Sequence, residues 1–223
     1  MKALNAAILT ERRDVFILDG VRFSLEMERA AYSRLLRAMR GIERGPADKP
    51  PGDAIALRAL ESAWSVCDSV HRVRGLVGQV RGLSHGEPTM QLFFRAAKGV
   101  EDARNFIQHI GSGIGKLGEL TVPLVGQLRW KYASGLGGVS LSVGHWTKGT
   151  HGWTPVIDLQ TMQIVDGIWF SVADSTFDLE ALHKNCRALS RHLERWLRKS
   201  GLVGSTPTRP STLRFGRHPS AGA

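Results

Sequence analysis

The amino-acid sequence predicts a mainly helical bundle with a small antiparallel β-meander inserted before the last helix. Apolar residues recur every three or four positions over four segments, which is typical of helices that bury one face. Between about 119 and 172 the apolar period shortens to about two, which is typical of strands. With 223 residues, of which 42% are hydrophobic, the chain is long enough for one well-packed domain.

The first two helices are separated by a loop that the sequence marks clearly. The first helix is expected over about 24–39, with its apolar residues at Leu25, Ala31, Leu35, Leu36 and Met39. The stretch 45–52 is rich in Pro and Gly and cannot continue a helix. Asp53 is a suitable N-cap for a second helix that runs to about 79. Gly75 and Gly78 should weaken its last turn.

Two further amphipathic segments predict a third and a fourth helix. The third is expected over about 89–110, with Thr89 as its N-cap after Pro88 and with glycines 111 and 113 ending it. The fourth is expected over about 178–199. Its core-facing seam has three- and four-residue spacing and comprises Leu179, Leu182, Cys186, Leu189, Leu193 and Trp196.

The segment between the third and fourth helices predicts strands. Apolar and polar residues alternate over 127–132 and again over 139–143, with a glycine-rich turn between, which indicates a β-hairpin. One or two more strands are expected at 154–159 and 164–172. Residues 1–201 are therefore interpreted as a single domain with a β-rich insertion at about 119–172, and residues 202–223 as a disordered basic tail.

Composition excludes several classes of protein. No run of about 18 apolar residues is present, and the apolar stretch 6–9 is too short for a signal peptide, so a cytoplasmic protein is expected. Cys67 and Cys186 both fall on apolar helix stripes, which favours buried free thiols over a disulfide or a zinc site. His145 and His151 have no acidic or thiol partner nearby, so no metal is expected.

A net charge of +10 favours polyanionic partners such as nucleic acids. Arginine greatly outnumbers lysine, however, and a GC-rich genome gives the same bias. The charge alone is therefore weak support for nucleic-acid binding.

The third predicted helix carries a continuous polar arc. With Arg104 set at zero and about 100° per residue, its apolar residues cluster between about −20° and −120°. Gln108 then lies near 40°, Glu101 near 60°, Asn105 near 100° and His109 near 140°, at about 100° per residue. Arg104 and His109 are thus expected to flank a groove, which a second helix or a second subunit would close into a pocket.

The segment Arg-Asn-Phe-Ile-Gln-His at 104–109 resembles the motif of the HEPN superfamily, in which an arginine and a polar residue precede a histidine four to six positions after the arginine. The resemblance implies a HEPN-like helical bundle that forms a homodimer and cuts RNA without metal in a cleft between the two motif helices. It also implies that Arg104 holds the scissile phosphate, that His109 transfers protons and that Asn105 orients one of them. Toxin–antitoxin or phage-defence systems, with an antitoxin or nucleotidyltransferase partner, are the implied setting.

The residue types also fit RNA cleavage on chemical grounds. RNA carries its own nucleophile, the 2′-OH, so cleavage needs proton transfer and stabilisation of negative charge on the phosphate. A histidine that titrates near neutrality can transfer protons. An arginine offers a permanently charged donor fork for phosphate oxygens. Neither a metal nor a cofactor is required.

The second predicted helix supplies three supporting residues. Asp68 lies one turn from His71 and Arg72, and its carboxylate is expected to pair with Arg104, as an acidic residue on the neighbouring helix often does in the HEPN family. The alternative is an ordinary surface pair between Asp68 and Arg72. His71 is expected either as a core-border histidine bonded to a neighbour or as a second catalytic group. With Gln108, His71 and Arg72 are the expected substrate-binding residues.

Other patterns leave alternatives open. Arg187 and His192 repeat the arginine–histidine spacing on the last helix, but Ala188 stands where the family has a polar residue. The β-rich segment contains four tryptophans, which are Trp130, Trp146, Trp153 and Trp169. They are expected either to stack on single-stranded RNA or to fill the core. The alternatives to a ribonuclease are a non-catalytic HEPN-like module that binds nucleic acid or nucleotide, and a helical protein–protein adaptor.

Overall fold

The computed structural model describes residues 12–46, 51–109, 126–131, 138–142, 157–158, 163–164, 166–172 and 175–201. Its helices are α1 (Arg12–Glu43), α2 (Asp53–Val77), α3 (Pro88–Ala96), α4 (Lys98–Gln108) and α6 (Leu179–Lys199). Its strands are β1 (Gln127–Lys131), β2 (Gly138–Ser142), β3 (Ile157–Asp158), β4 (Gln163–Ile164), β5 (Ile168–Val172) and β6 (Ser175–Asp178).

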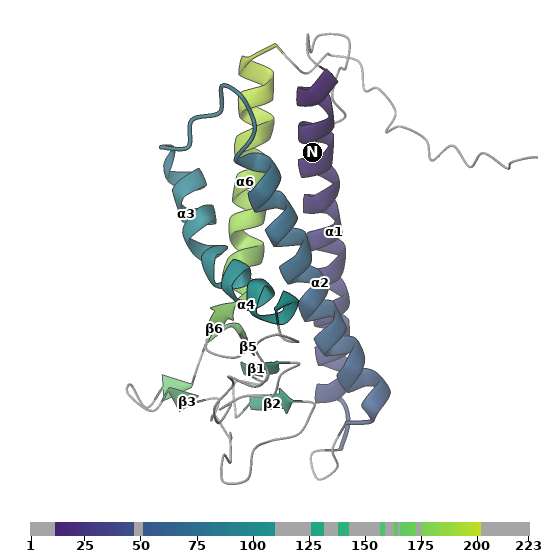
Figure 1. Ribbon diagram of the computed structural model, residues 1–223. Helices are drawn as coiled ribbons and strands as arrows, with labels where there is room; N and C mark the ends of the chain where they lie inside the picture. Colours follow the sequence, from purple (N-terminus) through teal and green to yellow (C-terminus); the bar gives the residue numbers. More distant parts are fainter. Residues whose placement is uncertain are drawn as a thin grey trace, which may run out of the picture.

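The long helices α1, α2 and α6 lie side by side, and the short helix α3 packs against α6 (Figure 1). Helix α4 follows α3 at the end of the bundle where the sheet lies, in contact with both α2 and β6 (Figure 1). The expectation of a mainly helical protein with a small antiparallel sheet is confirmed. None of the described helices is long and apolar enough to cross a membrane.

Helix α1 begins 12 residues before the position that the sequence predicted. The buried residues Ile17, Leu18 and Val21 extend its apolar face toward the N-terminus, where they join the core. The interruption of that pattern by Arg22, which is itself buried, obscured the continuation in the sequence. Its guanidinium is held by Asp19 on the preceding turn, with Nη2 and Oδ1 2.8 Å apart.

The single helix predicted over 89–110 is two helices in the structure, which corrects that expectation. Ala97 ends α3 and precedes α4, with φ −77° and ψ −8°. Gly99, in the first turn of α4, lies so close to β6 that an added Cβ would meet the ring of Phe177 at 3.3 Å. The break therefore redirects the chain from α6 onto the sheet and α2.

Both N-caps that the sequence predicted were wrong. Gly52 precedes α2 and Glu87 precedes α3, so neither Asp53 nor Thr89 is the N-cap. Pro88 occupies the first turn of α3, where its missing N–H leaves no helical hydrogen bond unmade. Asp178 caps α6 by accepting hydrogen bonds from the backbone N–H groups of residues 180 and 181.

The sheet is antiparallel with the strand order β2-β1-β5-β6, and β3 pairs only with β4. The predicted hairpin of β1 and β2 is confirmed, with Leu128 opposite Leu141. The simple meander order was wrong, because β1 also pairs with β5, where Leu128 lies opposite Phe170, 42 residues later in the chain. Strand β6 was not predicted.

Aromatic side chains join the sheet to the bundle. Trp130 is 1% exposed, and its indole N–H donates to Oε1 of Glu43, at the end of α1, over 2.9 Å. Phe170 packs edge-on against Trp64 of α2, with centroids 5.4 Å apart. Trp130 therefore belongs to the core, while the half-buried Trp169 donates to the backbone oxygen of Asp166.

Several sequence expectations fall outside the described residues. These are the segment 1–11, the glycines 111 and 113, His145, His151, Trp146, Trp153 and the tail 202–223. The two cysteines are described: both are buried and free, as the apolar stripes predicted. Burial raises the pKa of each thiol, and Asp68 raises that of Cys67 further.

Candidate nucleic-acid interface on α2 and α4

Helix α4 is fixed on α2 and β6 by its apolar face, and this sets the direction of its polar residues. Val100 and Ala103 are fully buried, as are Val70 and Val73 of α2. Of the polar residues that follow Ala103, Arg104 is half-buried, whereas Asn105, Gln108 and His109 are exposed. The polar arc predicted from the sequence therefore faces solvent.

The structure contains the ion pair that the sequence suggested between α2 and α4. Oδ1 of Asp68 lies 3.4 Å from Nη1 of Arg104. The Arg104 side chain is only 25% exposed, while that of Asp68 is 47% exposed. One side of the guanidinium is thus anchored, and the remaining donors of its planar fork can bind an oxyanion.

A second ion pair between the same helices was missed in the sequence. Nη1 of Arg74, on α2, contacts Oε2 of Glu101, on α4. The Arg74 guanidinium also lies over the ring of Phe94, 6.0 Å from its centroid. Glu101 was placed on the polar arc, but nothing in the sequence indicated that Arg74 would face it.

His71 lies on α2 between the two residues of that helix that form these pairs, Asp68 and Arg74. Its side chain is half-buried, and Nδ1 is shielded from solvent with no hydrogen-bond partner among the described residues. Burial lowers the pKa of His71, the Arg104 charge lowers it further, and Asp68 opposes the effect. The sequence suggested either a core-border histidine bonded to a neighbour or a second catalytic group. The structure shows no such hydrogen bond at Nδ1 of His71 within the described residues.

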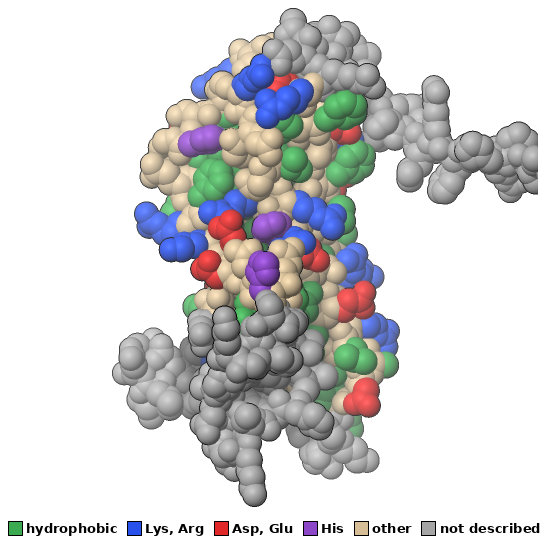
Figure 2. Space-filling model, viewed as in Figure 1, with side chains coloured by type: hydrophobic (Ala, Val, Ile, Leu, Met, Phe, Trp, Pro, Cys, Tyr) green, Lys and Arg blue, Asp and Glu red, His purple; other side chains and the backbone are tan. Residues whose placement is uncertain are grey.

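The remaining predicted site residues are exposed around this pair of contacts. Arg72 on α2 and Asn105, Gln108 and His109 at the end of α4 all face solvent. His109 is the C-cap of α4, and its backbone N–H donates to the carbonyl of Asn105 over 3.1 Å. Figure 2 shows two histidine side chains one above the other where α2 and α4 meet, with basic and acidic side chains around them. This face therefore presents imidazole and guanidinium groups together.

The second arginine–histidine spacing, on α6, has a different environment. Arg187 is exposed and forms no ion pair with another of the described residues. His192 is half-buried, and its Nε2 is shielded from solvent without a partner in the described part of the chain. Helix α6 thus offers no anchored guanidinium next to an exposed imidazole.

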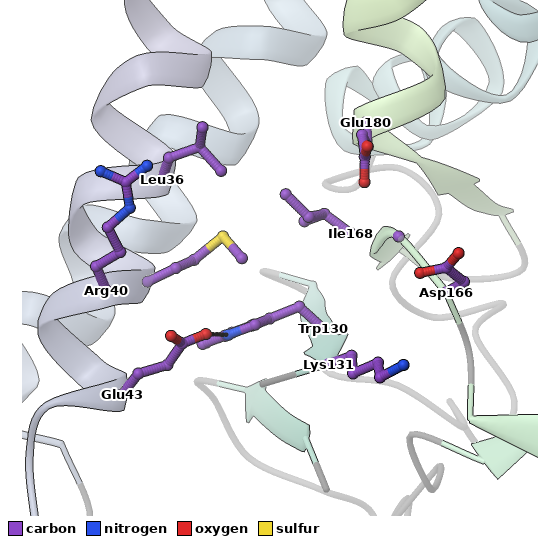
Figure 3. A pocket seen from close by; sticks show the side chains of 10 residues that line it. Leu36, Arg40, Glu43, Trp130, Lys131, Asp166, Ile168 and Glu180 are labelled. Carbon is purple, nitrogen blue, oxygen red and sulfur yellow. Dashed lines mark hydrogen bonds between the residues drawn. The ribbon is translucent and has the colours of Figure 1, made fainter. Parts of the chain in front are cut away.

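A separate pocket of about 380 Å³ lies between the end of α1 and the sheet (Figure 3). Its apolar lining includes Met39 and Ile168. Arg40 extends from α1 on the side opposite Asp166 and Glu180 (Figure 3). Glu180 is already paired with Lys184, over 2.7 Å. The pocket shares no lining residue with the α2–α4 face.

Within the described residues no group of three or more His, Cys, Asp and Glu side chains is arranged to hold a metal ion. Comparison with models of protein families, with curated proteins and with solved structures found no match. The resemblance to the HEPN superfamily therefore rests on residues 104–109 and on the supporting Asp68.

Proposed function

We propose that this protein binds RNA across the face formed by α2 and α4 and cuts it by attack of the 2′-OH, without a metal. The observation that carries the proposal is the Asp68–Arg104 pair, which fixes a guanidinium between two helices beside exposed Asn105 and the His109 that caps the same helix. The net charge of +10 supports a polyanionic substrate.

The roles follow from what each side chain can do. Arg104 binds a non-bridging phosphate oxygen and stabilises the charge that grows during attack. His109 transfers a proton at the 2′-oxygen or at the leaving 5′-oxygen. Asn105 orients the phosphate, and Arg72 and Gln108 bind the neighbouring nucleotides. These side chains lie on two rigid helices, which suits a site that needs fixed spacing.

The proposal includes a homodimer in the cytoplasm. His109 lies five residues beyond Arg104, about 7.5 Å further along the helix axis. One helix therefore holds the two groups apart, and a second copy of α4 facing the first would bring an arginine and a histidine from different subunits to one phosphate.

The test uses the purified full-length protein and a labelled single-stranded RNA in the presence of EDTA. Cleavage with a 2′,3′-cyclic phosphate end is expected, and the same sequence with 2′-deoxyribose should stay intact. His109→Ala should abolish cutting while the circular dichroism spectrum stays unchanged. His85→Ala is the matched control, since His85 is exposed but outside this face and packs against Phe94.

Cleavage that persists in His109→Ala would contradict the proposed mechanism. Salt-sensitive RNA binding without any cleavage would instead support the non-catalytic binding module, which the positive charge also favours. Neither binding nor cleavage, together with a protein that co-purifies, would indicate an adaptor.

A further inference from the structure

The environment of His71 determines which of its two ring nitrogens carries the proton. Nδ1 is buried, and none of the described residues provides an acceptor for it. A proton on Nδ1 would therefore be a buried donor without a partner, which is costly and rare in folded proteins. The tautomer with the proton on Nε2 costs less, because a buried acceptor lone pair without a partner is tolerated better than a buried N–H without one.

The charges around His71 act in the same direction. Arg72 and Arg74 on α2 and Arg104 on α4 all disfavour a positive imidazolium. Among the described residues, Asp68 is the acid that favours it. Glu101, the other carboxylate of this face, is occupied by Arg74. Protonation would add a fourth positive charge and also create the unpartnered N–H at Nδ1. The imidazole is therefore held neutral near pH 7.

We infer that His71 is a neutral hydrogen-bond donor that binds a phosphate oxygen through Nε2–H, beside the guanidinium of Arg104. In this role His71 binds and orients the phosphodiester but transfers no proton, which leaves proton transfer to His109. The inference deepens the proposed function and rests on it for the identity of the ligand, an RNA phosphodiester. The tautomer itself depends only on the folded protein.

The first experiment measures the tautomer in the protein without RNA. Long-range ¹H–¹⁵N spectra should show His71 with its proton on Nε2 at pH 7, the signals being assigned by their loss in His71→Gln. On acidification His71 should become half-protonated only below pH 6.5, the ordinary pKa of a histidine. A proton on Nδ1, or half-protonation of His71 at or above pH 6.5, would overturn the inference whether or not the protein cuts RNA.

The second experiment adds a 2′-deoxy oligonucleotide, which cannot be cut by 2′-OH attack. The Nε2–H proton signal of His71 should move on binding, and the same titration of Arg104→Ala should give a smaller shift. If the oligonucleotide binds and the His71 signal stays in place, the donor role is wrong. This readout is independent of cleavage.

The third experiment separates hydrogen bonding from proton transfer in RNA cleavage. His71→Ala should lower kcat/KM about 10- to 100-fold, the effect expected from losing one hydrogen bond to a charged oxygen, without changing the pH dependence. His71→Gln should recover most of the rate, since its amide N–H reaches about as far as Nε2. Loss of one limb of the pH profile in His71→Ala would instead make His71 a proton-transfer group and overturn the inference. If His71→Ala and His109→Ala leave cutting unchanged, the proposed function fails as well.

Discussion

Oε1 of Glu28, on α1, lies 3.0 Å from Nδ1 of His183, on α6, and this contact joins the two helices inside the bundle. Glu28 is 1% exposed. The His183 ring stacks on Tyr32, with centroids 4.1 Å apart and planes 8° from parallel. Burial raises the pKa of the Tyr32 hydroxyl, and Glu180, Asp178 and Glu28 add to the effect. A largely buried polar cluster thus connects α1 and α6.

Replacing Glu28 by Ala should destabilise the protein by about 2 kcal/mol, because it leaves Nδ1 of His183 without its partner and opens a cavity. Urea unfolding followed by circular dichroism measures the change. Glu61→Ala is the control: its side chain is exposed on α2 and pairs with none of the described residues, so its effect should stay within about 0.5 kcal/mol. Equal effects of the two variants would show that the buried contact contributes little.

Two glycine-to-alanine variants should have opposite effects on stability. Gly126 has φ +104°, and an added Cβ would meet the Phe170 ring at 2.7 Å, so Gly126→Ala should cost about 2–3 kcal/mol. Gly75, in α2, has open space around its Cβ position, so Gly75→Ala should stabilise by about 0.5–1 kcal/mol through helix propensity. Thermal unfolding of the two variants measures both effects: Gly126→Ala tests the packing of the sheet, and Gly75→Ala tests the stability of α2. A neutral Gly126→Ala would contradict the close approach of residue 126 to Phe170.

Asp68→Asn should separate activity from stability. Its side chain is 47% exposed, so the loss of the pair with Arg104 should cost less than about 1 kcal/mol. RNA cleavage should fall at least about tenfold, because the Arg104 guanidinium loses the group that orients it. Glu61→Gln, at an exposed position of the same helix, should leave both quantities unchanged. A large loss of stability with unchanged cleavage would show that the pair is structural.

The lowered pKa of His71 predicts a pH dependence of stability. Because the folded state binds this proton less readily than the unfolded state, His71 reduces the stability of the folded state as the pH falls through 6.5, the ordinary pKa of a histidine. Well above that pH the residue is neutral in both states and has no such effect. His71→Gln should therefore lose less stability than the wild type between pH 7 and 5, as measured by urea unfolding. An identical decline in both proteins would contradict the lowered pKa.

The elements that the sequence predicted well are those whose own pattern determines them. The α6 seam is buried at five of its six predicted positions, and Trp196, the sixth, is half-buried and donates to the backbone oxygen of Gly82. The β1–β2 hairpin is likewise local, since its two strands lie close together in the sequence, at 127–131 and 138–142. In both cases the pattern of residues within the element is enough to predict it.

The elements that the sequence could not predict depend on contacts between distant segments. Ala97 is a good helix former, and the break there became visible only with α4 packed on β6, where Gly99 meets Phe177. The pairing of β1 with β5 and the contact of Arg74 with Glu101 have the same origin. Arg104 and Asp68 could be paired beforehand because the HEPN resemblance supplied the relation between the two helices.

The two ion pairs between α2 and α4 have opposite charge arrangements. In the first pair α2 supplies the acid, Asp68, and α4 the base, Arg104. In the second pair α2 supplies the base, Arg74, and α4 the acid, Glu101. A slip of one helical turn along this interface would bring Arg74 toward Arg104, or Asp68 toward Glu101, so that like charges would oppose each other. Sliding of α4 is thereby disfavoured in both directions. The charge pattern therefore opposes a change of register between the two helices, and it fixes the spacing of the polar groups on the α2–α4 face.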